Sequence, residues 1–126
     1  MRDIDELTYK VIGCAMEVHN VLGPGLLESV YEQALIHELS MNGIPARAQV
    51  DIDVNYKGIN ITNGFRIDLL VDETLIVELK SVEELKSIHY KQLLTYLRIM
   101  DKRIGLLINF NSINLKDGIK RVVNNY

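Results

Sequence analysis

The chain has 126 residues, of which 48% are hydrophobic and 25% are charged, and its formal net charge is −3 at pH 7. This length and balance predict one folded domain over residues 1–126 and exclude a disordered or fibrous chain. No apolar run approaches the ~20 residues of a membrane-spanning helix, and the N-terminus, MRDIDELTYK, is too acidic for a signal peptide. We therefore expect a cytoplasmic protein without a membrane partner.

The acidic net charge argues against a module that binds nucleic acid through a large basic excess. The charges are unevenly distributed, however. Residues 1–63 carry four Lys or Arg and nine Asp or Glu, whereas residues 64–126 carry ten and eight. The single cysteine, Cys14, lies at an apolar position of a helical pattern, so we expect it to be buried.

Two helices are predicted in the first third of the chain. Apolar residues at spacings of three and four predict the first over residues 5–22, and Gly23-Pro24-Gly25 ends it because proline cannot continue a helix. A second helix is predicted over residues 27–42, with Asn42-Gly43 as its stop signal. The residues expected to face inward are Leu7, Val11, Ala15, Val18 and Leu22, followed by Leu27, Val30, Ala34 and Leu35.

The middle of the chain alternates apolar and polar residues, which is the pattern of half-exposed strands. We predict strands over residues 46–56, 59–62, 65–71 and 75–79. Lys57-Gly58 and Asn63-Gly64 are predicted turns between them. These strands would form an antiparallel meander.

The helical pattern returns over residues 82–100. Residues 103–109 are apolar and few, as in a buried strand, and the helix before them predicts that this strand joins the sheet in parallel. Residues 115–126 fit either a helix or an edge strand. The predicted fold class is α/β, with a central mixed sheet that contains the meander and is flanked by helices.

The register of the hairpin over residues 65–80 is restricted by its apolar faces. Ile67 and Leu69 would share the core-facing side of the first strand, and Leu69 must then lie opposite Val77. A two-residue loop at Asp72-Glu73 would break this pairing, so a longer loop or a bulge is expected. The resulting neighbours on the other face are Asp68 opposite Glu78 and Arg66 opposite Lys80.

Two adjacent carboxylates repel each other, and a divalent cation relieves that repulsion. Mg²⁺ prefers hard oxygen ligands and keeps several waters, so Asp68, Glu78 and a substrate phosphate make a suitable ligand set. Lys80 can stabilise a phosphate charge or help water lose a proton. The alternative interpretation is a solvated cross-strand ladder of charges.

The pattern Asp68, Glu78-x-Lys80 resembles the PD-(D/E)XK nuclease superfamily. The segments GPGLLESVYE, IDLLV, LIVELKSVE, QLLTYLR and GLLINF, with G-x-x-E-x-x-Y at Gly25, Glu28 and Tyr31, look like the GxxExxY protein family within it. The resemblance covers nearly the whole chain. The proline of the superfamily motif is Ile67 here.

The resemblance implies a restriction-endonuclease-like core in which Glu28 joins Asp68 and Glu78 as a metal ligand and Lys80 is catalytic. Gln92 and Tyr96 resemble the Q-x-x-x-Y motif of RecB-like members. One helical turn apart, they would share a face and contact water or DNA. Alternatively, they are a polar anchor and a core tyrosine.

Two further residues are expected to support the site. Tyr31 either steers Glu28, contacts substrate or packs against the sheet, and packing is favoured. Arg66 is predicted to support the site from beside Lys80.

The predicted function is that of a nuclease dependent on Mg²⁺ or Mn²⁺, which hydrolyses phosphodiester bonds in nucleic acid, with DNA favoured. The resemblance also implies a homodimer, because many superfamily nucleases work as dimers. The alternative is a non-catalytic interaction module or a subunit of a larger assembly. That alternative predicts an exposed apolar patch that contains residues such as Tyr90 or Phe110.

Overall fold

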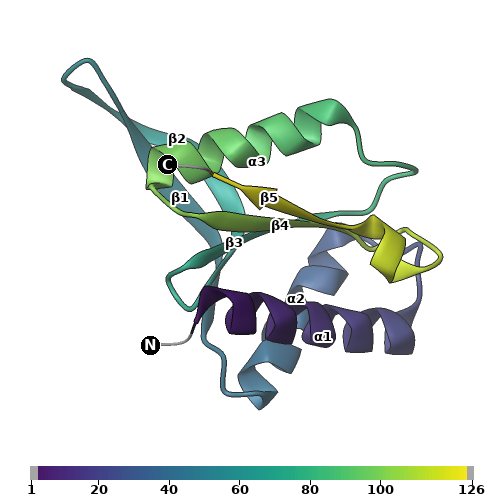
Figure 1. Ribbon diagram of the computed structural model, residues 1–126. Coiled ribbons are helices and arrows are strands. Elements are labelled where there is room, and N and C mark those ends of the chain that lie inside the picture. The colour runs from purple at the N-terminus through teal and green to yellow at the C-terminus, as the bar shows by residue number, and fades with distance from the viewer. Residues whose placement is uncertain (1–2, 125–126) are drawn as a thin grey trace.

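The computed structural model describes residues 3–124. The elements in chain order are α1 (Ile4–Leu22), α2 (Glu28–Met41), β1 (Ala46–Tyr56), β2 (Ile59–Val71), β3 (Leu75–Lys80), α3 (Ser87–Met100), β4 (Ile104–Asn109), the 3₁₀ helix η1 (Leu115–Gly118) and β5 (Ile119–Val123). The five strands form one mixed sheet in sequential order, with α1 and α2 on one face and α3 on the other (Figure 1). The predicted α/β fold class is confirmed.

The two N-terminal helices lie close to their predicted bounds. α1 begins after Asp3, whose side chain accepts a hydrogen bond from the Asp5 amide at 2.7 Å and caps the helix. In α2 the buried stripe is Tyr31, Leu35 and Leu39. The inward positions predicted for Leu22, Leu27 and Val30 are wrong, since these side chains are 39%, 74% and 39% exposed.

The meander is formed by three strands instead of the predicted four. β1 and β2 make a long antiparallel hairpin that projects beyond the helices (Figure 1). Asn63-Gly64 does not form the predicted turn. It lies inside β2, where the register shifts opposite Ile52–Val54, and the Asn63 amide donates to Asp53 Oδ1 at 2.9 Å. An extra stretch of strand is thus absorbed as a bulge.

The second half of the fold forms a crossover. α3 connects β3 to β4, which pair in parallel as predicted. α3 begins five residues later than predicted because Val82 is held in the preceding loop by Asn109, whose side chain bonds both its amide and its carbonyl. Residues 115–123 resolve into η1 and the antiparallel edge strand β5, and residues 125–126 lie outside the described part.

The sheet separates two hydrophobic clusters. The first packs β2, β3 and β4 against α1 and α2 and includes Cys14, which is buried as predicted. The second packs the other face of the sheet against α3 through Leu93 and Leu97. Within residues 3–124, no helix has the length and apolar character needed to cross a membrane.

Candidate functional site

The predicted hairpin register is correct. Leu69 lies opposite Val77 and Val71 opposite Leu75, so residues 72–74 form the three-residue loop that the apolar faces require. The backbone ladder between β2 and β3 ends at the Leu69–Val77 pair. Beyond this point the two strands are joined by side chains.

Asp68 and Glu78 make that connection reciprocally. The Asp68 amide donates to Glu78 Oε2 at 2.7 Å, and the Leu79 amide donates to Asp68 Oδ2 at 2.8 Å. Each carboxylate therefore accepts a backbone hydrogen bond from the opposite strand. The predicted convergence of these two acids is present, and both are fixed in place by the backbone.

A local irregularity of β2 accompanies this arrangement. Leu69 is buried in the first hydrophobic cluster and Ile67 in the second, so the two residues face opposite sides of the sheet. The predicted shared face for Ile67 and Leu69 is therefore wrong, because strand alternation breaks at Asp68. The paired strand is affected too: Gln49 falls between the Ala48–Leu69 and Val50–Ile67 pairs and has a left-handed φ of 52°. Such distortions re-aim side chains at functional sites.

The local electrostatics favour a compensating positive charge. Glu78 is only 5% exposed, and burial together with the neighbouring Asp68 charge raises its pKa to about 8. The Asp68 amide and the Lys80 ammonium oppose this rise in the pKa of Glu78. At neutral pH the buried carboxyl thus keeps a proton unless a cation takes its place.

Lys80 lies two residues after Glu78 on β3, so both side chains leave the same face of the strand. It is half-buried, and its carbonyl accepts a hydrogen bond from the Phe110 amide at 2.9 Å, which ties the strand end to β4. Within residues 3–124, Lys80 forms no ion pair with a carboxylate at 4.0 Å or less. Its ammonium is therefore available for a negatively charged ligand.

α2 contributes two acids to the site, Glu28 and Glu32, and Glu32 was not among the residues predicted from the sequence. Glu28, the first residue of the helix, is exposed. Glu32, one turn later, accepts a hydrogen bond from Gln49 Nε2 at 2.7 Å. Burial, and after it the charges of Asp68 and Glu28, raise the pKa of Glu32, while the Gln49 bond lowers it. The only available sequence signal was the four-residue spacing from Glu28.

α3 brings Tyr96 to the site. Its ring stacks on Phe65 with centroids 4.2 Å apart and planes 4° apart. Burial raises the pKa of Tyr96, and the charges of Glu78 and Asp68 raise it further, so both carboxylates lie within electrostatic reach. Gln92, one turn earlier, is exposed. Tyr96 thus packs in the core, as one of the two predicted interpretations has it, and lies near the acids, while contact of Gln92 and Tyr96 with water or DNA stays a prediction.

Tyr31 acts on the loop that precedes Glu28. It is fully buried and stacks on Phe110, with centroids 4.5 Å apart. Its hydroxyl donates to the Gly23 carbonyl at 2.6 Å and accepts from the Leu26 amide at 3.0 Å. The favoured prediction of packing matches this geometry, and substrate contact does not. The loop also meets β3, since Ser81 Oγ donates to the Leu26 carbonyl at 2.7 Å.

Arg66 does not lie where the hairpin register predicted. The ladder with β3 ends before it, and its guanidinium pairs with Asp51 of β1 at 2.8 Å. The predicted pairing with Lys80 is therefore wrong. The cause is again the break of alternation at Asp68, which the regular extrapolation from Leu69 did not include.

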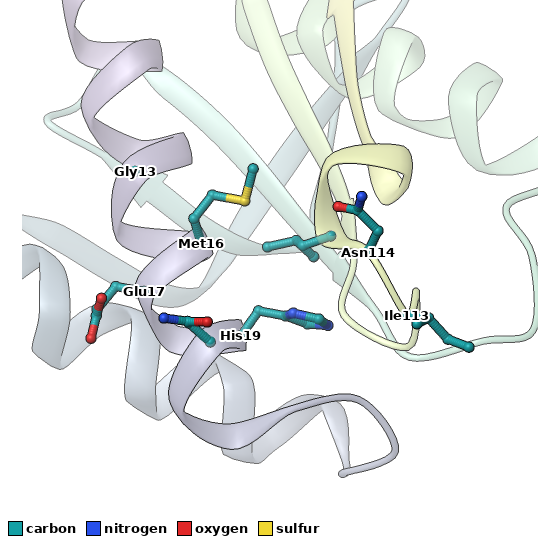
Figure 2. Close-up of a pocket in the computed structure, with 8 residues that line it drawn as sticks. Gly13, Met16, Glu17, His19, Ile113 and Asn114 are labelled. Carbon is teal, nitrogen blue, oxygen red and sulfur yellow. The ribbon is translucent and has the colours of Figure 1, made fainter.

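A separate hollow of about 440 Å³ lies between α1 and the segment before η1 (Figure 2). Its lining includes His19, whose Nε2 lies 2.8 Å from the Ser112 carbonyl. None of the predicted site residues line it. The candidate site at the β2–β3 junction is therefore distinct from this hollow.

The donor set suits a divalent cation in part. Asp68 and Glu78 offer two hard carboxylates at one place, and hard oxygen ligands with several waters are what Mg²⁺ takes. Within residues 3–124, however, no group of three His, Cys, Asp or Glu side chains is close enough to hold a metal ion. The predicted triad with Glu28 is thus not assembled in this conformation, and the two strand acids form the fixed half of the site.

The geometry defines an α/β protein in which two acids and a lysine, in the order D…E-x-K, meet on adjacent strands. A family model described as the PD-(D/E)XK nuclease superfamily matches residues 5–122, so the chain belongs to that superfamily. Among solved structures, SSO0001 is similar, with a TM-score of 0.55 and 20% sequence identity. The alignment covers 79% of this chain and 51% of SSO0001, so this chain spans about half of that protein and shares its fold. No curated protein matches this chain.

Proposed function

We propose that the chain is a divalent-metal-dependent nuclease that hydrolyses phosphodiester bonds in DNA, and that within the superfamily it is a GxxExxY protein. The observation that carries the proposal is the reciprocal bridge between Asp68 and Glu78 beside an ammonium without an ion-pair partner among residues 3–124. A buried acid with a strongly raised pKa next to a second acid marks a functional site. A purely structural charge ladder would have no need to bury Glu78.

In this proposal Asp68 and Glu78 hold Mg²⁺ or Mn²⁺, and Glu28 completes the ligand set from α2. The cation would supply positive charge that polarises the phosphodiester and lowers the pKa of water. Lys80 places its ammonium against the phosphate oxygens, where it balances the charge that develops during attack. Gln92 and Tyr96 position water or substrate from α3.

The bridge gives the two strand acids a defined separation. Each uses one named oxygen to accept a backbone hydrogen bond, so neither carboxylate has to be ordered when a ligand binds. Preorganised ligands cost less entropy on binding than mobile ones. Glu28 is exposed and lies outside this fixed pair, so its approach is the step that completes the site.

The test is a titration of Mg²⁺ and Mn²⁺ into the wild type and into an Asp68→Ala, Glu78→Ala variant. Heat release and cleavage of labelled DNA and RNA are followed. The matched control is Glu17→Ala, Asp117→Ala, which removes two exposed acids from α1 and η1 and changes the formal net charge by the same amount. We expect binding and cleavage in the wild type and the control, and loss of both in the site variant. Normal hydrolysis by the site variant would remove the mechanism.

The non-catalytic alternative predicted that Tyr90 or Phe110 lies in an exposed apolar patch. Phe110 is fully buried, and Tyr90 packs partly buried against the second hydrophobic cluster. These two positions therefore give no support to the interaction module. The homodimer and the cytoplasmic location stay predictions.

A further inference from the structure

The two helical layers of the fold carry opposite charge. α3 contains Lys91 and Arg98 and no Asp or Glu. The nearest acids in sequence, Glu84 and Asp101, lie beyond its two ends. On the other face of the sheet, α1 and α2 contain one Lys or Arg, Lys10, against the acids Asp5, Glu6, Glu17, Glu28, Glu32 and Glu38.

The basic residues of α3 face outward. Leu93 and Leu97 are buried against the sheet, whereas Lys91 and Arg98 are exposed on the opposite side of the helix. Seven residues apart, they are about 10 Å apart along the helix axis, which is the axial length of about three nucleotides of a B-form strand. Thr95, also exposed, lies between them and adds a hydroxyl.

Among residues 3–124, Lys91 and Arg98 have no acidic side chain as an ion-pair partner. The ion pairs found within residues 3–124 engage Lys10, Arg47, Arg66 and Arg121, all outside α3. Lys91 and Arg98 are therefore not neutralised by a carboxylate at 4.0 Å or less in that part of the chain. Cations without such partners can neutralise phosphates without first losing an internal bond.

A third cation lies on the same side of the sheet. Lys120 of β5 is exposed and lies opposite Leu107 of β4. Leu107 belongs to the hydrophobic cluster under α3, and directly opposed residues of antiparallel strands point to the same face. Lys120 therefore projects on the α3 side.

The inward face of the same helix meets the candidate site. Tyr96 lies on that inward face, where its ring stacks on Phe65 of β2 and the charges of Asp68 and Glu78 act on its hydroxyl. A strand bound along the outer face of α3 would thus be held on the side of the sheet from which Tyr96 approaches the two acids. A nucleic acid that approached the other face of the sheet would instead meet the acidic helices α1 and α2.

We propose that the exposed face of α3, with Lys91 and Arg98 together with Lys120 of β5, is the surface that binds the phosphate backbone of the nucleic acid substrate. The proposal rests on the proposed function and adds the direction from which substrate approaches. Backbone contacts of this kind are independent of base sequence and strongly dependent on salt. The acidic net charge of the chain is compatible with this surface because the negative charge is concentrated on the opposite layer.

The experiment measures binding without cleavage. A fluorescein-labelled 20-nucleotide DNA, single-stranded and as a duplex, is titrated with the full chain in EDTA, and its anisotropy is followed from 25 to 200 mM KCl. The variants are Lys91→Gln, Arg98→Gln as a pair and Lys120→Gln alone. The control, Lys116→Gln, removes an exposed lysine from η1 and is on the side of α1. Thermal unfolding checks that each variant is folded. Glutamine has a helix propensity close to those of lysine and arginine, so the double variant in α3 should stay folded.

In the wild type, the logarithm of the binding constant should fall linearly with the logarithm of the KCl concentration. In the Lys91→Gln, Arg98→Gln variant the magnitude of this slope should be smaller by about 1.8 for duplex DNA or about 1.4 for single strands, and binding should be weaker at every salt concentration. Lys120→Gln should lower the slope by about half as much, and Lys116→Gln should leave it unchanged. Equal slopes for the wild type and the folded double variant would overturn the inference, and so would wild-type chain that binds neither DNA. Cleavage with Mg²⁺ is measured separately, so wild-type cleavage with unaltered binding in the double variant refutes this surface and leaves the nuclease proposal in place.

Discussion

The buried acid Glu78 predicts an unusual pH dependence of stability. Its pKa is raised from 4.5 to about 8 because it is buried and lies beside Asp68. The folded chain therefore binds this proton more tightly than the unfolded chain. The resulting stabilisation is fully present below about pH 4.5 and is lost as the pH rises through about 8. This is the opposite sign to that of an ordinary salt-bridged carboxylate.

The magnitude follows from the size of the shift. At about 1.36 kcal/mol per pKa unit, the rise from 4.5 to about 8 corresponds to roughly 3–5 kcal/mol, the lower value applying where Asp68 shares the proton. For a domain of this size, about 4 °C of Tm corresponds to 1 kcal/mol. Without metal, the wild-type Tm should thus fall by about 10–20 °C between pH 5 and pH 9 through this group alone.

The perturbation that isolates the effect is Glu78→Gln. Glutamine has nearly the same shape, and its side-chain oxygen can still accept the Asp68 amide at the position of Oε2. Thermal unfolding is followed by circular dichroism at half-unit pH steps in EDTA, with the exposed-site variant Glu17→Gln as control. We expect a flat difference curve for the control, and a Glu78→Gln variant that is more stable than the wild type at pH 9.

Mg²⁺ supplies the second arm of the same assay. A cation at the two acids favours their ionised forms, so it should restore the wild-type Tm at pH 8–9, by about 2.7 kcal/mol at 100 times its Kd. Glu78→Gln should gain less. The reasoning is refuted if the wild type and Glu78→Gln lose stability in parallel from pH 5 to 9, because Glu78 would then titrate as an exposed carboxyl.

Three further changes test the supporting structure. Tyr31→Phe should destabilise the chain by about 1–3 kcal/mol in urea unfolding, because the Gly23 carbonyl and the Leu26 amide lose their hydrogen-bond partner. Faster amide exchange confined to residues 23–26 would distinguish this loss of hydrogen bonds from a general loss of packing. Gly105→Ala should lower the free energy of unfolding by about 1–3 kcal/mol, since the added methyl would lie 2.9 Å from Leu93 of α3. Unchanged stability in urea would show that α3 shifts freely to make room for it. Glu28→Gln should weaken Mg²⁺ binding in calorimetry by about 10-fold and more than Glu32→Gln does, because Glu28 is the proposed α2 ligand and Glu32 is held by Gln49. A larger loss in Glu32→Gln would make Glu32 the α2 ligand instead.

The fold could be predicted closely because its signals are local. Apolar spacing located the three α-helices and most strand bounds, although η1 was left open and α3 begins five residues later than predicted, and the parallel strand β4 followed from the crossover before it. What the sequence could not provide was the effect of distant side chains on local structure. The apolar spacing predicts that a helix starts at Val82. The side chain of Asn109, 27 residues later, instead bonds the backbone of Val82 and holds it in a loop.

The site was predictable to the extent that its chemistry depends on register. The apolar pattern alone requires Leu69 to oppose Val77, which places Asp68 beside Glu78, and the hydrogen bonds between the two strands agree with it. The same rule failed for Arg66, since it assumes unbroken alternation through Asp68. No residue type in this part of β2 predicts the break in alternation. The residue with a left-handed φ is Gln49, which lies on the neighbouring strand β1.

The break and the site share one physical cause. A regular β2 would continue the backbone ladder past Leu69, and the amides of Asp68 and Leu79 would then bond to carbonyls. Because alternation breaks at Asp68, these amides instead bond the two carboxylates, which are thereby fixed at the strand junction and, for Glu78, taken out of water. A buried carboxylate beside a second acid is unstable without a proton or a cation, so the irregularity that a pattern-based prediction misses is also what makes this position suited to bind a metal.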